Sequence, residues 1–527
     1  MDRRAFLRRS AFVGGGLLLG ACGDDAGTAA PNPTSTVPSS STTLPSSTTT
    51  RPFDPSTPYW LQGGFAPVTE EVVATDLVVN GALPPSLHGL YARNGSNPAT
   101  GNSPHWFFGD GMIHGVRFEQ GKAVWYGNRY VETPMYLDRR EFGEFDGAPG
   151  FSQTQSNVSV FAHGGRLLAL GEVGWPFEIS PADLSTIDTV ELRGAGDISV
   201  GPNVTAHPKR DPDTGLLHFF GYGFTPPYLT YYVASADGRE LLRREEIPVA
   251  AGTMIHDFAI TESDVVFWEL PVVFDLAAAA AGALNPFTWD PDYGSRIGVM
   301  PLGGAASDMR WVEIDNGYVF HGTNAHRDGD RIILDVSRMG SMFDNGNDID
   351  DSPSLLTRWE IGTGGAELTW SASQLSDVPL DLPEIDDRFT GRAHSVAWLV
   401  ETADTVEGPA GINDPATNNL ATNNLATNNV EINGISAYHV ATGALDRWTP
   451  GPALQPNEAT FVADSADSAE GEGWLLTYVW DKANDASVLA VLDATDVAAG
   501  PVATIELPQR VPFGFHGTWM PGDEIDA

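Results

Sequence analysis

The chain has 527 residues, of which 42% are hydrophobic and 19% are charged, a composition typical of a folded protein with a sizeable core. The formal net charge of −40 excludes nucleic acid as a ligand, because phosphate binding needs a basic surface. Cys22 is the only cysteine, which excludes an intrachain disulfide and a thiolate metal cluster. A bound transition metal would therefore need nitrogen and oxygen ligands.

Residues 1–22 have the pattern of an export signal. Four arginines precede an apolar stretch at residues 11–21, which is too short to span a bilayer. Arg3-Arg4 resembles the twin-arginine signal that exports folded proteins, and residues 19–22 (Leu-Gly-Ala-Cys) resemble a bacterial lipobox. We expect a lipoprotein that is anchored through Cys22 on the extracytoplasmic side of the cell membrane. A plain signal peptide with an incidental cysteine is the alternative.

Residues 23–57 are predicted to be a flexible linker. They consist almost entirely of Ser, Thr, Pro, Ala and Gly, so they cannot bury enough apolar surface to fold. After this linker no apolar run approaches the length of a transmembrane helix. A second polar stretch, the five-residue repeat at residues 416–429, is expected to be a surface loop without a function of its own.

Residues 58–527 are predicted to form one large all-β domain. Short segments rich in β-branched and aromatic residues alternate with Gly, Asp, Asn and Pro turns. The clearest of these segments are residues 165–172, 228–235, 264–270, 330–337 and 473–481. Helical patterns are scarce, and residues 276–284 are the best candidate. The pattern favours a propeller, or several barrels or sandwiches, and no clean repeat period chooses among them.

Four of the twelve histidines stand apart by their context. His256, His321 and His516 each follow an apolar or aromatic residue where a buried strand is expected to meet a turn, and His207 lies in TAHPKRDPDTG. Such positions allow imidazoles to converge on an interior cavity. The other histidines are expected to be structural. The exceptions are His105 and His114, which could line an approach to the cavity, and His326, which is expected in a solvent-facing turn.

Motifs in chain order resemble those of the carotenoid cleavage oxygenase family, which includes apocarotenoid oxygenases and lignostilbene dioxygenases. The resemblance covers nearly all of residues 60–527. Its motifs include LHGLYARNGSNP (87–98), HWFFGDGMIHGVRF (105–118), TAHPKRDPDTG (205–215), NPFTWDPDYGSRIGVMP (285–301), RFTGRAHSVAW (388–398) and VPFGFHGTW (511–519). The resemblance implies a seven-bladed β-propeller, with loops and short helices capping one face, that binds one Fe(II) ion through His207, His256, His321 and His516.

The resemblance also implies an outer shell of carboxylates. Four neutral imidazoles bring no charge to balance the metal, so carboxylates that accept their second ring N–H are expected. The matching positions are Glu172 for His256, Glu384 for His321 and Glu458 for His516, which leaves His207 without a carboxylate partner. Glu458 lies in the motif that departs most from the usual family form.

The implied reaction is the cleavage of an apolar, conjugated double bond with O₂ by a chain that we expect to be a monomer. A tunnel lined by aromatic residues is expected, with Phe107, Phe108, Tyr130, Phe320 and Trp519 as candidates. In similar enzymes a lysine soon after the RYV-type strand contacts hydroxystilbenes. Residues 128–146 contain no lysine, which favours a carotenoid or apocarotenoid over a stilbene. A metal-free binding propeller and an isomerase that uses the same iron site are further alternatives.

Overall fold

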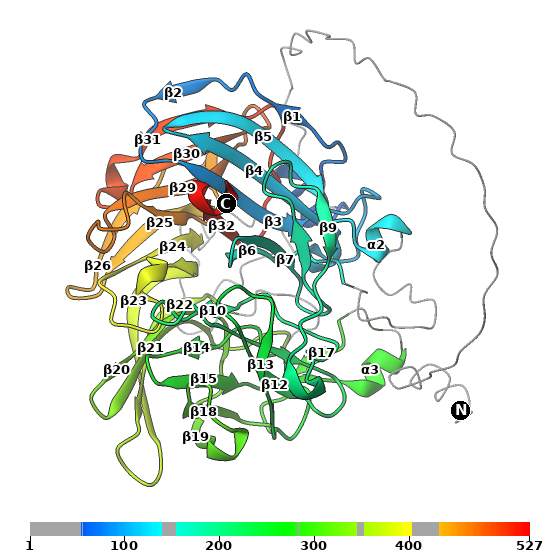
Figure 1. Cartoon of the computed structure of the whole chain (residues 1–527), viewed down its shortest axis with the longest axis vertical. Helices are drawn as coiled ribbons and strands as arrows, with labels where there is room; N and C mark the ends of the chain where they lie inside the picture. The colour runs from blue at the N-terminus through cyan, green and yellow to red at the C-terminus, as the bar shows by residue number, and fades with distance from the viewer. Residues whose placement is uncertain are drawn as a thin grey trace, which may run out of the picture.

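The structure, a computed structural model, describes residues 54–526 except 55, 140–153, 282, 284, 345–351 and 403–431. The predicted signal at residues 1–22, nearly all of the predicted linker, and the repeat at residues 416–429 lie outside the described residues. The described part consists almost entirely of antiparallel strands, as predicted (Figure 1). Within it, no helix is long and apolar enough to cross a membrane.

Seven blades make up the described fold, which confirms the propeller expected from the motifs. The first blade comprises β1 (Val73–Ala74), β5 (Lys122–Tyr130), β4 (Gly111–Glu119), β3 (Gly89–Ser96) and β32 (Gly517–Pro521). The second blade comprises β6 (Ser159–His163), β7 (Arg166–Leu170), β8 (Phe177–Ile179) and β9 (Thr186–Thr189). The third blade comprises β10 (Lys209–Arg210), β11 (Leu217–Tyr222), β12 (Leu229–Ala234) and β13 (Leu241–Ile247).

The remaining strands complete the ring. The fourth blade comprises β14 (Ala259–Ile260), β15 (Asp264–Glu269), β18 (Ser295–Pro301) and β19 (Arg310–Ile314), and the fifth comprises β20 (Tyr318–Asp328), β21 (Arg331–Met339), β22 (Leu355–Gly362) and β23 (Thr369–Glu384). The sixth blade comprises the end of β23 with β24 (Val396–Thr402), β25 (Ile432–His439) and β26 (Ala444–Trp448). The seventh comprises β27 (Leu454–Pro456), β28 (Thr460–Ala463), β29 (Gly473–Asp481), β30 (Ala486–Asp493), β31 (Pro501–Glu506) and β2 (Val79–Gly81).

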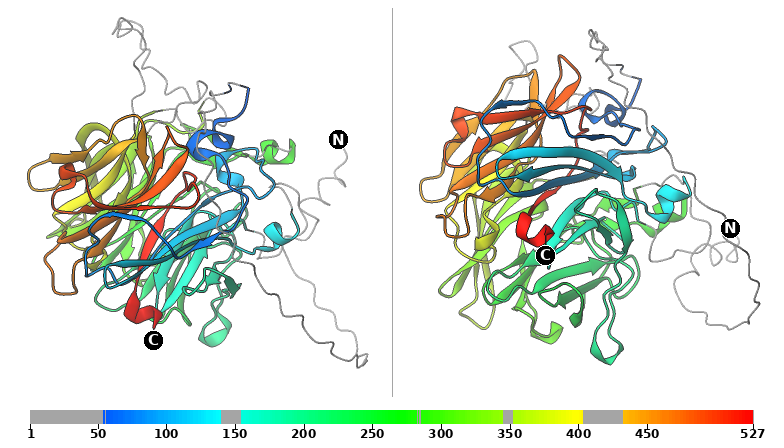
Figure 2. Two further views of the ribbon diagram at one scale, coloured as in Figure 1. Left: turned by 90° about the horizontal axis from the view of Figure 1, so that it is seen from above. Right: turned by 45° about the horizontal axis from the view of Figure 1, so that its top comes forward.

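Two features of the strand pairing shape this ring. Strand β23 belongs to two blades, because residues 369–379 pair with β22 whereas residues 380–384 pair with β24. The two ends of the chain close the ring: β32 pairs with β3 in the first blade, and β2 pairs with β31 in the seventh (Figure 2). The closure joins segments more than 400 residues apart in sequence, so the axis is enclosed by continuous blades.

The hydrophobic core lies between neighbouring blades. Leu90 and Ile113 of the first blade pack against Val160 and Leu167 of the second, and similar clusters fill the spaces between other pairs of blades. Strands such as β11, β12 and β15 are buried along their whole length, because sheets cover both of their faces. This explains why they are continuous apolar and aromatic runs rather than alternating patterns.

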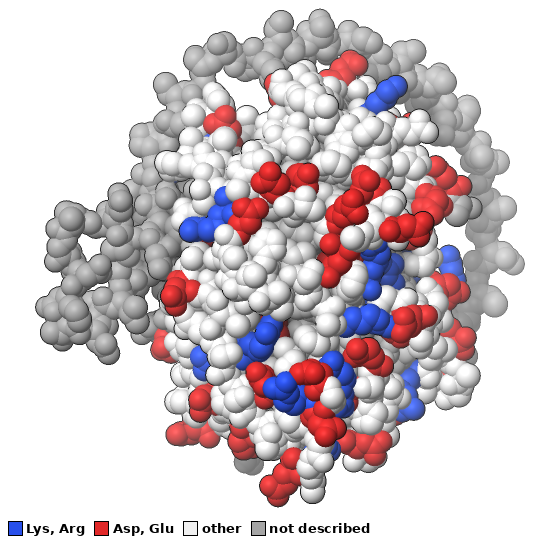
Figure 3. Space-filling view, turned by 90° about the vertical axis from the view of Figure 1, so that its left-hand side faces the viewer, with Lys and Arg blue, Asp and Glu red and all other residues white. Residues whose placement is uncertain are grey.

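Helices are short and peripheral in the described part of the chain. The predicted helix at 276–284 is present as α3 (Leu276–Ala281), beside the hairpin of β16 (Val272–Phe274) and β17 (Phe287–Trp289). It lies on the same side of the molecule as α2 (Pro134–Leu137) (Figures 1 and 2). Acidic side chains predominate over basic ones on the face drawn in Figure 3, as the net charge of −40 leads one to expect.

Candidate metal centre

The four predicted histidines come together on the propeller axis from four different blades. Each lies at or near the start of the innermost strand of its blade: His207 two residues before β10, His256 three residues before β14, His321 within β20, and His516 directly before β32. These strand starts face one another around the axis. Side chains separated by up to 309 residues in sequence therefore meet in one place.

The spacing of the four rings suits one metal ion. One ring nitrogen from each histidine lies within 4.8 Å of the others, and the Nε2 atoms of His207 and His256 are 2.9 Å apart. Two imidazoles bound at right angles to one ion through bonds of about 2.1 Å would place their nitrogens about 3 Å apart. In addition, Nε2 of His321 is buried and has no hydrogen-bond partner among the described residues. Neutral imidazole suits Fe(II) among other first-row ions.

Two of the three predicted carboxylates contact the expected histidines. Glu172 Oε2 lies 2.8 Å from His256 Nδ1, and Glu458 Oε1 accepts a hydrogen bond of 2.7 Å from His516 Nδ1. Each carboxylate has a second partner, since Tyr222 donates to the Oε1 atom of Glu172 and the Gly517 N–H donates to the Oε2 atom of Glu458. With the proton on Nδ1, the Nε2 lone pair is free to bind a metal.

The third predicted carboxylate is wrong: Asp381, not Glu384, contacts His321. The Nδ1 atom of His321 donates to Asp381 Oδ1 over 2.7 Å. The strand register between β23 and β24 shifts between Asp381 and Glu384, and Leu382 adopts a φ of 51°. The register shift thus lies between the carboxylate that contacts His321 and the one that was predicted to do so.

Glu384 instead faces a cavity of about 130 Å³ beside the metal centre, which Asp387 and Lys209 also line. One oxygen of Glu384 accepts a hydrogen bond of 2.9 Å from the Phe461 N–H. Burial, and then the neighbouring charges of Asp387 and Glu458, raise the pKa of Glu384 well above its usual value. Glu384 is thus a poor source of negative charge for the metal, whereas the pKa of Asp381, despite its burial, is lowered by His321.

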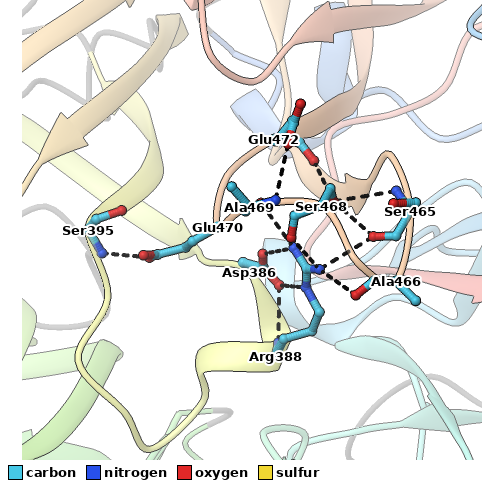
Figure 4. Close-up of polar contacts among 9 residues, drawn as sticks. All are labelled: Asp386, Arg388, Ser395, Ser465, Ala466, Ser468, Ala469, Glu470 and Glu472. Carbon is cyan, nitrogen blue, oxygen red and sulfur yellow. Dashed lines mark hydrogen bonds and ion pairs between the residues drawn. The ribbon is translucent and has the colours of Figure 1, made fainter.

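The segment that follows Glu384 is fixed by Arg388 (Figure 4). Its guanidinium makes a two-point contact with Asp386, at 2.8 and 2.5 Å, and donates to backbone carbonyls of the 465–469 loop, including those of Ala466 and Ser468, both at 3.1 Å. The guanidinium thus ties the short helix η6 (Asp387–Phe389) to the loop between β28 and β29. This contact fixes one wall of the cavity beside the metal centre.

His207 differs from the other three ligands in its electrostatic surroundings. Among the described residues no carboxylate contact is recorded for it, and burial together with the other three histidines and Lys209 lowers its pKa well below the usual value. For His256, burial lowers the pKa, but the Glu172 carboxylate more than offsets this and the net pKa is raised. The charged surroundings of the two ligands therefore differ: Lys209 lies near His207, whereas Glu172 contacts His256.

Aromatic side chains border one side of the centre. The ring of Phe320 packs edge-on against His256, with 5.1 Å between the ring centres, and Phe107 lies next to Phe320 and Phe515. Phe107 and Phe320 were among the five predicted aromatic residues, whereas Phe515 was not. Phe108 packs against His105, with 5.5 Å between the ring centres.

The other two predicted aromatic residues belong to the core. Tyr130 is buried and bonded to the Val68 carbonyl. Trp519 packs against Phe118 between the first and seventh blades. The aromatic lining was thus predicted in kind but only partly in position.

Three further histidines were given a location from the sequence. His105 does lie near the aromatic side, with its ring 4.7 Å from that of Phe107. His114 is a core residue, 1% exposed and bonded to Tyr126, so the prediction that it lines the approach is wrong. His326 is also not in a turn: it lies within β20, partly buried, with its ring 6.5 Å from that of His394.

Comparison with known proteins gives relatives along almost the whole chain. A family profile described as "Retinal pigment epithelial membrane protein" matches residues 65–521. The carotenoid cleavage oxygenase of Mycobacterium tuberculosis is 34% identical over 520 residues, covering 88% of this chain and 97% of the relative. The isoeugenol monooxygenase of Pseudomonas nitroreducens is 31% identical over 489 residues, covering 88% and 98%. The crystal structure of lignostilbene dioxygenase from Pseudomonas brassicacearum matches with a TM-score of 0.76 at 30% identity, covering 89% and 99%.

Proposed function

The chain belongs to the family of the retinal pigment epithelial membrane protein and the carotenoid cleavage oxygenases, and we propose that it cleaves a carbon–carbon double bond of a carotenoid or apocarotenoid. It is a non-haem iron dioxygenase with one Fe(II) per chain. The observation that carries the proposal is the convergence of His207, His256, His321 and His516, with their ligand atoms within 4.8 Å of one another.

The residues around the iron have separable tasks. The iron, when bound, supplies the capacity to activate O₂ for attack on a double bond. Glu172, Asp381 and Glu458 hold the proton of three imidazoles on Nδ1, orient the rings and provide negative charge. Phe320 and its aromatic neighbours exclude water and offer an apolar surface on which a conjugated chain can lie.

An apolar substrate fits the described surroundings better than a phenolic one. Phe107, Phe320 and Phe515 provide no hydrogen-bonding side chain for a hydroxyl group. Residues 128–146 contain no lysine, and Lys209, the lysine nearest to the ligands in sequence, is already paired with Asp257 over 2.8 Å. A site that must hold a phenol gains its selectivity from polar partners, which would stay unsatisfied with a hydrocarbon.

The second candidate is a dioxygenase for stilbenes or related phenylpropenes. It is favoured by the relatives named isoeugenol monooxygenase and lignostilbene dioxygenase, which match as large a share of the chain as the carotenoid enzymes do. A metal-free binding propeller is the weaker candidate, because such a protein has no use for four convergent histidines and their outer carboxylates.

The experiment that decides between the substrates compares kcat/KM for an apocarotenal and for a hydroxystilbene. The iron-loaded full chain is used, and the aldehyde products are identified by mass spectrometry. We expect apocarotenal to be preferred by at least tenfold, a difference of about 1.4 kcal/mol in transition-state binding. Preference for the hydroxystilbene would overturn the substrate assignment, and no cleavage of either would overturn the proposed function.

The proposal includes a location outside the cytoplasmic membrane. Its support is the arginine-rich start and the Leu-Gly-Ala-Cys run at residues 19–22, and it assigns Cys22 as the lipid-bearing residue of a monomeric enzyme. Cys22→Ser should release the protein from the membrane fraction without changing turnover. Retention of the variant in that fraction, in the same amount as the unchanged chain, would contradict the anchor.

A further inference from the structure

Asp257 is a buried carboxylate that none of the tasks above uses. It directly follows His256, and its residue is 1% exposed. Its Oδ1 atom receives the Lys209 ammonium at 2.8 Å and the Phe258 N–H at 2.8 Å, and its Oδ2 atom accepts from the Gly322 N–H at 2.9 Å. An ionised group is buried only where its partners compensate for lost hydration, and here all of the partners come from segments near the metal ligands.

The three partners place Asp257 between three blades. Lys209 lies two residues after His207, in β10. Gly322 directly follows His321, in β20. One carboxylate therefore connects the segments after three of the four ligands.

The strand ladders at these segments are short or irregular. Strands β10 and β14 contain only two residues each. In β20 the register against β21 shifts on both sides of Gly322, so His321 lies in an irregular stretch of the ladder. The Gly322 N–H turns to Asp257, and a Cβ atom at this position would lie 2.9 Å from the Trp268 ring, so the close approach requires glycine.

The ion pair also sets the charge next to His207. Lys209 is a cation with a side chain that is 22% exposed, and it lies two residues after His207 in the sequence. Asp257 balances this charge in a place where an unpaired ion would be costly. Removing the carboxylate would leave both the ammonium and the Gly322 N–H without their buried partner.

We propose that Asp257 is a positioning residue that sets the spacing of His207, His256 and His321 by holding the three segments behind them together. This inference rests on the proposed function only in requiring that the four histidines bind a metal. Without Asp257 the three rings would no longer be held at ligand distance, so the metal would leave faster and its coordination geometry would change.

The test uses the full chain loaded with Co(II), whose visible absorption spectrum depends on the arrangement of its ligands. Metal loss is followed after an excess of EDTA is added, for the unchanged chain, Asp257→Ala, Asp257→Asn and Lys209→Gln. Asp264→Asn is the matched control. Asp264 is likewise buried, is paired with Arg327 through two contacts of 2.6 Å, and links the fourth blade to the fifth, but Arg327 lies six residues after His321, near the other end of β20.

We expect Asp257→Ala to lose Co(II) roughly 10–100-fold faster than the unchanged chain, with an altered spectrum, as is usual for outer residues of metal sites. Asp257→Asn should show a smaller acceleration, because its carboxamide oxygen can still accept from Gly322. Lys209→Gln should resemble Asp257→Asn, since it removes the same ion pair from the other side. Asp264→Asn should lower the thermal unfolding midpoint of the metal-free chain and leave the spectrum and the rate of loss unchanged.

An Asp257→Ala chain with the spectrum and rate of the unchanged chain would overturn the inference. If that variant does not fold, unchanged spectra in both Asp257→Asn and Lys209→Gln would overturn it equally. An acceleration of Co(II) loss in Asp264→Asn as large as that in Asp257→Ala would also overturn it, because it would show a general loss of stability. If the variants behave as expected but the iron-loaded chain cleaves neither substrate class, the inference is supported and the proposed function is contradicted. A chain that binds no Co(II) would contradict both.

Discussion

Around the propeller axis, side chains are placed by charged hydrogen bonds, whereas between the blades they are placed by apolar packing. At the axis, Glu458 orients His516 over 2.7 Å, and the strand pairing that carries His321 is irregular. Between the blades, residues such as Leu334 lie in regular ladders and are fully buried. We therefore expect metal affinity and folding stability to depend on separate sets of residues, which substitutions can tell apart.

The largest effect is expected from a ligand. His256→Ala removes one of four nitrogen donors and leaves Glu172 without its imidazole partner. We expect the variant to retain no iron and to have no measurable turnover, while its blades still fold. Elemental analysis and circular dichroism check this. Full iron content together with full turnover would contradict the assignment of His256 as a ligand.

The next effect separates two neighbouring carboxylates. Asp381→Asn removes the charge that holds the His321 ring, so iron affinity should fall roughly 10–100-fold. Glu384→Gln, three residues away, should change the affinity less than twofold, because Glu384 contacts no histidine and its raised pKa favours the neutral form. Iron titration of both variants measures the two affinities. The opposite order would restore Glu384 as the partner of His321.

A blade substitution should act on stability alone. Leu334 in β21 is 0% exposed and belongs to the cluster between the blades, so Leu334→Ala should lower the free energy of unfolding by about 2–5 kcal/mol. Iron affinity of the folded protein should remain within twofold. Urea unfolding and iron titration measure the two quantities. A tenfold loss of affinity would show that the blades and the axis are not separable.

The smallest effect concerns pH. His218 in β11 is 2% exposed, and burial lowers its pKa from 6.5 to about 4. The unfolded chain therefore binds a proton at this residue below pH 6.5, and the folded chain does not until near pH 4. As the pH drops across this window, this residue should lower the free energy of unfolding by about 1.4 kcal/mol per pH unit. His218→Asn should flatten the dependence. If the free energy of unfolding has the same pH dependence in His218→Asn and in the unchanged chain from pH 6.5 to 4.5, the prediction is contradicted.

Much of the blade architecture was predictable from the sequence. Segments such as residues 264–270 and 330–337 are β-rich and bounded by turn residues, and they form β15 and β21. Their number and pairing were not predictable from residue pattern, because the blades share no clean sequence period. The resemblance to a known family supplied the propeller and the four histidines.

The parts that failed depend on local backbone irregularity. The pattern around DLPEID cannot show that the register shifts after Asp381, so the sequence motif wrongly predicts Glu384 as the partner of His321. Asp257 was missed because it directly follows the ligand His256 and because its partners Lys209 and Gly322 come from other blades. A signal for it was present: a charged residue within an apolar run, next to a ligand, is expected to be buried and paired.

The central claim, an iron(II) centre that splits a double bond of a carotenoid or apocarotenoid with O₂, is tested most directly by isotope labelling. The iron-loaded chain is given an apocarotenal under ¹⁸O₂, and the carbonyl products are trapped by rapid reduction and analysed by mass spectrometry. We expect two products, each with one labelled oxygen, and none from His256→Ala. Uncleaved apocarotenal, or cleavage that does not require the four histidines, would contradict it.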